Sequence, residues 1–99
     1  MCTARTGSEM QIIVHPRIAE RHPDLSEEDV RFAWQHANIS ALRTESSNFP
    51  EMLSLGHDSQ GRLLEMVGAM TVDGWLIYHA MTPPSKKTLL ELRRAQRKS

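Results

Sequence analysis

Residues 62–81 read RLLEMVGAMTVDGWLIYHAM, and this stretch decides the fold of the 99-residue chain. Its first half, residues 62–71, is apolar on both faces of a strand except at Glu65, which predicts a strand in the centre of a sheet. Val72-Asp73-Gly74 is typical of a tight hairpin turn, because Asp-Gly pairs adopt the positive φ angles that such turns require. Residues 75–81 are then expected to form the partner strand.

Weaker patterns extend this hairpin on both sides. Residues 51–57 alternate and predict another strand, joined to the central one by a turn at residues 58–61. The run MQIIV at residues 10–14 is rich in β-branched side chains and predicts a first strand. Pro16 follows this run and fits the first turn of a short helix, which we expect at residues 17–21.

Two longer helices are expected. Ser26 can cap the first of them together with Asp29, which lies three residues later. An apolar stripe at helical spacing follows: Val30, Ala33, Trp34, Ala37 and Ala41. We expect this helix to end around residues 38–41 and to be followed by a polar loop at residues 43–50. Ser85, after two prolines, caps a final helix at residues 86–97.

The expected element order is therefore β-α-α-β-β-β-α. Consecutive strands joined by short turns, with helices before and after them, predict an α+β fold with a small antiparallel sheet. The length suits one domain. We place this domain at residues 10–97 and expect a flexible tail at residues 1–9.

Several features predict a cytoplasmic protein that does not meet a membrane. No stretch approaches the roughly 18 apolar residues that span a bilayer. Residues 1–10 are polar and lack the apolar run of a signal peptide. Cys2 is the single cysteine, so the chain has no internal disulfide, as expected in a reducing compartment.

Charge is distributed unevenly along a chain whose formal net charge is zero. Residues 1–60 hold nine acidic residues and five Lys or Arg, whereas residues 61–99 hold three acidic residues and seven Lys or Arg. This asymmetry indicates an anionic partner for the C-terminal half. The alternative is that basic residues near a helix end aid solubility and complement the helix dipole.

Candidate chemistry gathers where the last strand meets the last helix. Tyr78 and His79 stand near the end of that strand, and alternation would place them on opposite faces. Lys86 and Lys87 occupy the first helical turn, where a bound anion would offset their unfavourable interaction with the helix dipole. In the alternative interpretation His79 is a hydrogen-bonded core residue and the lysines are only solvated.

Other polar residues leave two interpretations open. Glu65 can face solvent or pair with Arg62, or it can act as an acid or base. Arg93 lies on one line of the last helix with Lys86, which suits either phosphate contacts or a solvated helix face. The histidines do not have the spacing of a metal site, and we expect neither a metal nor another cofactor.

Three regions of the chain carry a more specific pattern. They are residues 21–30 (RHPDLSEEDV), residues 51–56 (EMLSLG) with residues 61–64 (GRLL), and residues 76–81 (LIYHAM) before the basic helix. Together they resemble the BrnT-type toxins of the RelE-like group of toxin–antitoxin ribonucleases. The resemblance covers residues 10–97 and agrees with the expected element order. It departs from the family at Met52 and Met81, where the family has arginines.

The resemblance implies the toxin of a type II toxin–antitoxin system, a RelE-like, RNA-binding endoribonuclease without a metal. In such a hydrolase a base removes the 2′-hydroxyl proton, the oxygen attacks the adjacent phosphate, and cations stabilise the charge that develops. The expected catalytic residues are His79, Arg62 and Lys86, and the expected substrate-binding residues are Tyr78, Lys87 and Arg93. The implied partners are RNA and a DNA-binding antitoxin protein.

Two alternatives remain at this point. The missing arginines suit a non-catalytic interaction module of the same shape, which binds a protein or nucleic acid without cleaving it. The methionine-rich composition also fits a small-molecule site between sheet and helices. An apolar sheet face left uncovered would favour a homodimer or an antitoxin complex.

Overall fold

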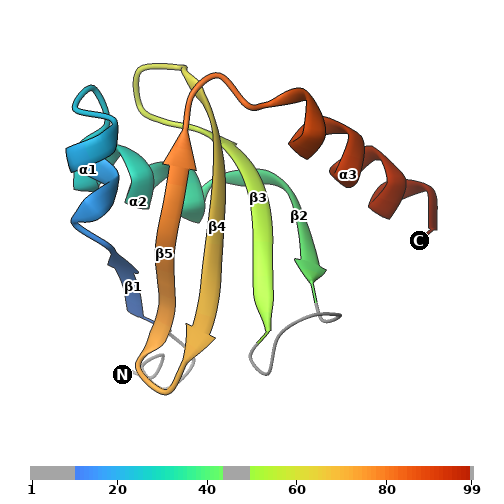
Figure 1. Ribbon diagram of the computed structural model, residues 1–99, viewed down its shortest axis with the longest axis horizontal. Helices are drawn as coiled ribbons and strands as arrows, with labels where there is room; N and C mark the ends of the chain where they lie inside the picture. Colours follow the sequence, from blue (N-terminus) through green and yellow to red (C-terminus); the bar gives the residue numbers. More distant parts are fainter. Residues whose placement is uncertain (1–10, 44–49, 99) are drawn as a thin grey trace, which may run out of the picture.

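A computed structural model describes residues 11–43 and 50–98, which form an α+β domain of a five-stranded sheet and three helices (Figure 1). The elements are β1 (Gln11–Val14), α1 (Arg17–Arg21), α2 (Glu27–Gln35), β2 (Ala37–Arg43), β3 (Glu51–His57), β4 (Leu63–Thr71), β5 (Gly74–Met81) and α3 (Lys86–Lys98). The expected tail at residues 1–9 and most of the expected loop at residues 43–50 lie outside the described residues. No helix in the described ranges is long and apolar enough to cross a membrane.

The sheet has the order β1-β5-β4-β3-β2. Strands β2 to β5 pair antiparallel with their neighbours along the chain, as expected from the short turns. β1 pairs parallel with β5, so the expected antiparallel sheet has one parallel strand at its edge. The cause is topological, because β1 pairs with the last strand rather than the next one, and no hairpin fixes its direction.

The extra strand, β2, corrects the expected order. The helical stripe was expected to continue to Ala41, but α2 ends at Gln35 and β2 begins at Ala37. Ala37 and Ala41 fit the helical period, but they also fit the two-residue period of a strand. Ile39 joins them on the partly buried side, and pairing with β3 provides the backbone with hydrogen-bond partners.

Most other boundaries follow the expected physical causes. Ser26 and Asp29 form the predicted capping box: the Asp29 N–H donates to Ser26 Oγ at 3.1 Å, and the Ser26 N–H donates to Asp29 Oδ2 at 3.0 Å. The Ser85 Oγ accepts from the Thr88 N–H at 3.2 Å and caps α3. β4 lies between β3 and β5, which confirms its predicted position inside the sheet.

The two faces of the sheet are covered unequally. α1 and α2 pack on one face over a buried cluster: Ile18, Leu25, Val30, Ala33, Leu64, Met66, Ile77 and Ala80. The other face has a smaller cluster in which α3 contributes one residue: Leu53, Leu55, Val67 and Leu92. In Figure 1, α2 passes behind the sheet and α3 extends beyond β2, so the near face is open over β4 and β5. We call this near side the open face.

A β-bulge changes which side chains of β5 share the open face. Val67 lies opposite His79 and Gly68 lies opposite Ile77, so Tyr78 is an extra residue in β5. Ile77 belongs to the cluster under α1 and α2, whereas both Tyr78 and His79 line the hollow on the open face. The expectation of strict alternation, which separated Tyr78 from His79, is therefore wrong.

Candidate functional site

A hollow of about 410 Å³ lies on the open face, and we call it the cleft. Its floor is formed by β4 and β5, with Glu65, Tyr78 and His79 among the lining residues. α1 contributes one rim, and the first turns of α3 contribute the other. The cleft therefore joins the strand end singled out in the sequence to a helix far from it in the chain.

Glu65 is the buried anion of this cleft, with 5% of its surface exposed. Its Oε1 accepts from the Ser85 N–H at 2.8 Å, and its Oε2 lies 2.7 Å from His79 Nε2. Burial tends to raise the pKa of Glu65, but the hydrogen bonds from Ser85, His79 and Thr88 outweigh burial and lower it. Glu65 is thus held as a carboxylate, and it contacts neither bulk solvent nor Arg62 as the sequence had left open.

His79 is oriented by this carboxylate. A carboxylate accepts hydrogen bonds, so the Glu65 contact fixes the proton of a neutral His79 ring on Nε2. The lone pair of Nδ1 then remains able to accept a proton. The His79 side chain is 37% exposed, so it can meet a ligand in the cleft. This is the arrangement of an oriented general base.

Tyr78 belongs to a neighbouring network of polar side chains. Its hydroxyl donates to Glu51 Oε2 at 2.7 Å, and burial together with Glu51 raises the pKa of Tyr78 to about 12. Arg43 Nη1 lies 3.9 Å from Glu51 Oε1. The same guanidinium donates two hydrogen bonds, each 2.8 Å long, to the two carboxylate oxygens of Glu91. Tyr78 therefore stays protonated at neutral pH and presents its ring, rather than an acidic hydroxyl, to the cleft.

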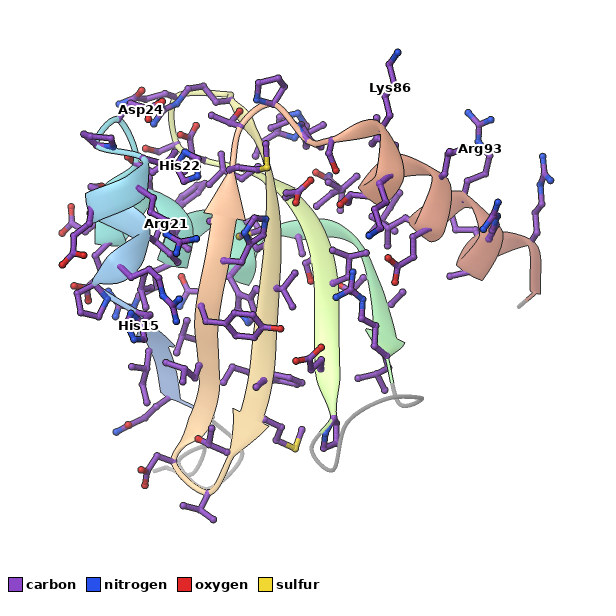
Figure 2. The ribbon with its side chains drawn as sticks, viewed as in Figure 1. His15, Arg21, His22, Asp24, Lys86 and Arg93 are labelled. Atoms are coloured by element: carbon purple, nitrogen blue, oxygen red, sulfur yellow. The ribbon has the colours of Figure 1, made fainter. Side chains whose placement is uncertain are left out.

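The cations of the cleft come mainly from both rims. Arg17 and Arg21 line it from α1, and Lys87 lines it from α3. Figure 2 shows Arg21 extending from α1 toward β5. Within the described part of the chain, the side chains of these three residues form no ion pair. They are available to an anion that enters the cleft.

The structure brings only some of the predicted site residues together. His79, Tyr78 and Lys87 line the cleft. Lys86 and Arg93 are exposed and do not line it, and Figure 2 shows both pointing away from the sheet.

Arg62, predicted as a catalytic cation, lies outside the cleft in an acidic cluster. Its guanidinium contacts Asp58 at 2.8 Å, Asp29 at 3.2 Å and Asp24 at 3.4 Å. We call Arg62 with these three aspartates the Arg62 cluster. Three acidic partners neutralise this arginine and leave it unsuited to bind a phosphate.

Sequence reasoning missed Arg17 and Arg21. They lie on a five-residue helix, more than 50 residues before His79 in the chain. Their only sequence signal is the spacing of four, which places two cations on the same face of a helix. That signal is common on solvated helices, and only the packing of α1 beside β5 gives it meaning.

Met81 and Met52, the two positions where the resemblance to BrnT-type toxins leads us to expect arginine, lie on different faces of the sheet. Met81 pairs with Glu65 in the β4–β5 ladder and shares the open face with it. Met52 pairs with Gly68, which packs on Trp34 of α2, so Met52 belongs to the helix-covered face. Only the departure at Met81 therefore bears on the cleft.

Among the described residues, no group of three or more His, Cys, Asp or Glu could hold a metal ion. Comparisons with models of known protein families, with curated proteins and with solved structures find no match to this chain.

Proposed function

We propose that this chain is a metal-independent endoribonuclease that acts as the toxin of a type II toxin–antitoxin system. The observation that carries the proposal is the Glu65–His79 pair, a buried carboxylate 2.7 Å from a partly exposed imidazole, in a cleft with cations on both rims. The resemblance to BrnT-type toxins supplies RNA as the anion and an antitoxin as the protein partner. The protein is then expected in the cytoplasm.

The cleavage step uses groups of the cleft. His79 Nδ1 takes the proton of a ribose 2′-hydroxyl, and the oxygen attacks the adjacent phosphorus. The bond from phosphorus to the 5′-oxygen breaks, leaving a 2′,3′-cyclic phosphate, and water protonates the departing 5′-oxygen. Glu65 stabilises the imidazolium that forms on His79. Arg17, Arg21 and Lys87 stabilise the negative charge that develops on the phosphoryl oxygens.

Tyr78 has a binding role in this proposal rather than an acid–base role. Its hydroxyl is engaged by Glu51 and its pKa is raised to about 12. The ring lies beside His79 on the open face because of the bulge in β5. A base next to the cleaved bond can stack on it.

The decisive experiment compares cleavage of a single-stranded RNA by wild type and by His79→Asn with a metal chelator present. We expect cleavage by the variant to fall about 10²- to 10⁴-fold, which is the usual contribution of a general base. His57→Asn is the matched control, because His57 is exposed and bonds to Asn38 outside the cleft lining. Equal cleavage by wild type and His79→Asn, or no cleavage by wild type, would defeat the proposal.

A second candidate is a non-catalytic module that binds RNA or a protein partner. Met81 favours it, because an uncharged side chain shares a face with Glu65 where the family has an arginine. This candidate predicts salt-sensitive RNA binding that survives in His79→Asn, with intact RNA throughout. Growth arrest on expression of wild type, lost in His79→Asn, would instead favour the ribonuclease.

A further inference from the structure

A second hollow adjoins the cleft between β2 and α3, and we call it the groove. It measures about 670 Å³, and its lining includes Leu42, Arg43, Lys87, Leu90, Glu91 and Arg94. Arg43, Lys87 and Glu91 line the cleft as well. The two hollows are therefore neighbours that share one wall, and a ligand chain can pass from one to the other.

The groove combines positive charge with exposed apolar surface. Its lining has three cations, Arg43, Lys87 and Arg94, against the single carboxylate of Glu91. Leu42 is 58% exposed and Leu90 is 50% exposed, and both line the groove, so exposed apolar surface gathers there. A nucleotide has the complementary chemistry, because it joins an anionic phosphate to a base with an apolar face.

The Arg43–Glu91 pair stands in the wall between the two hollows. Arg43 donates from Nε and Nη2 to both oxygens of Glu91, at 2.8 Å each. A phosphate accepts two parallel hydrogen bonds from an arginine in the same way. The two side chains are 35% and 36% exposed, so a phosphate can reach Arg43 and displace Glu91. Glu91 then occupies the position of an anion in the free protein.

We propose that the groove is a second nucleotide subsite, which holds the RNA next to the cleaved bond, with Arg43 and Arg94 on its phosphates and Leu42 and Leu90 against a base. In this arrangement Glu91 is an internal competitor for Arg43 and weakens RNA binding until the strand displaces it. The inference rests on the proposed function, because the RNA in the groove continues the strand in the cleft. Beyond the proposed function, it states that the protein recognises RNA on both sides of the wall between the cleft and the groove.

The test measures RNA affinity in a His79→Asn background, so that the RNA stays intact. The first probe is a labelled single-stranded RNA of about 12 nucleotides, which is long enough for both the cleft and the groove. The second is a dinucleoside monophosphate, which fills the cleft alone. Arg94→Gln should weaken binding of the long RNA about twofold to fivefold and lower its salt slope by about 0.7, the loss of one phosphate contact. It should leave the dinucleotide unaffected. Arg93→Gln is the matched control, because Arg93 is on the same helix and points away from the sheet (Figure 2).

Glu91→Gln tests the competitor role separately. It should tighten binding of both probes, because Arg43 lines both hollows. Weaker binding by Glu91→Gln would mean that Glu91 positions Arg43 rather than competing for it, and would overturn that part of the inference.

The remaining outcomes separate the groove from the cleft. Equal losses in Arg94→Gln and Arg93→Gln would indicate a diffuse effect of helix charge and overturn the groove as a subsite. Single-stranded DNA that binds as tightly as RNA, with the same dependence on Arg94, would overturn RNA as its occupant. Absence of binding to either RNA probe would reject the proposed function itself, whereas normal RNA binding without an Arg94 effect would reject only the groove.

Discussion

The Arg62 cluster and the cleft contain similar residue types but are built in opposite ways. In the Arg62 cluster one guanidinium meets three carboxylates, and Asp58 has a fully buried side chain. In the cleft the cations outnumber the carboxylates: Arg17 and Arg21 form no ion pair with a described acidic residue, and Lys87 interacts with Glu91 only over a longer distance than an ion pair. The first arrangement satisfies its charges internally and stabilises the fold. The second leaves positive charge for a ligand.

The balance of charged partners, rather than the presence of charge, thus distinguishes a structural cluster from a binding site. Arg62 stands beside a central strand that carries Glu65, and it was an equally reasonable catalytic candidate in the sequence. Three aspartates from the loop before α2, from α2 itself and from the β3–β4 turn remove it from that role. Substitutions in the Arg62 cluster and in the cleft should therefore have different effects, on stability in the first and on RNA in the second.

The largest effect is expected inside the Arg62 cluster, from Asp58→Ala. Asp58 Oδ1 accepts from the N–H groups of Gln60 and Arg62, and Oδ2 accepts from the Arg62 side chain. Losing these bonds should lower the free energy of unfolding by about 2–3 kcal/mol, measured by urea denaturation. Asp24→Ala is the control, because Asp24 contacts the same arginine but is 63% exposed and should cost less than about 1 kcal/mol. Equal losses in both variants would contradict the distinction.

Glu65→Gln should produce the next largest effect, on rate rather than on stability. The amide keeps the shape of Glu65 but cannot stabilise an imidazolium on His79 by charge. If the chain cleaves RNA as proposed, kcat should fall about tenfold while KM stays within about twofold, because the cations proposed to bind phosphate are untouched. A rise in KM with unchanged kcat would assign Glu65 to substrate binding instead.

Arg21→Gln should have a smaller effect, on RNA affinity alone. Removing one exposed cation that faces the cleft should weaken RNA binding about twofold to fivefold. Lys86→Gln is the matched control, since Lys86 is exposed and points away from the sheet (Figure 2). Fluorescence anisotropy with a labelled RNA measures both. If Lys86→Gln weakens binding as much as Arg21→Gln, then the cleft is not the place where RNA binds.

The smallest expected effect is the change with pH in the stability that Asp58 contributes to the Arg62 cluster. Burial tends to raise the pKa of Asp58, but hydrogen bonds from Arg62 and Gln60 outweigh it and lower the pKa. A lowered pKa means that Asp58 stabilises the fold above its unfolded pKa of about 4, and that this stabilisation disappears as the pH falls through the folded value. The stability difference between wild type and Asp58→Ala should therefore narrow below about pH 4. A difference that is constant from neutral pH to acid would contradict this.

The parts of the fold that depend on local chemistry could be predicted from the sequence. Contacts between residues close in the chain form three of these features: the Asp-Gly hairpin, the capping box of Ser26 and Asp29, and the Ser85 cap of α3. β2 could not be identified, because Ala37 and Ala41 suit both a helix and a strand until β3 is present to pair with. The parallel pairing of β1 depends in the same way on a strand more than 60 residues away.

The candidate site was predictable only in part, for a similar reason. Tyr78, His79 and Lys87 are near one another in the chain, and the sequence identified all three. Arg17 and Arg21 reach the cleft only through the packing of α1 beside β5, as Figure 1 shows for the two elements. Arg62 was misplaced because its aspartate partners come from three separate segments.

The bulge at Tyr78 gives β5 one position that can be removed without changing the pairing of the residues around it. One additional residue in β5 keeps Ile77 under the helices and turns His79 to the opposite side. A deletion of Tyr78 would restore a regular ladder in which His79 still pairs with Val67 and Ile77 with Gly68, so His79 would stay on the open face and only the tyrosine ring would be lost. Relatives without this position would therefore keep the Glu65–His79 contact and lose only the ring beside it, so the length of β5 separates the proposed acid–base pair from the proposed stacking surface.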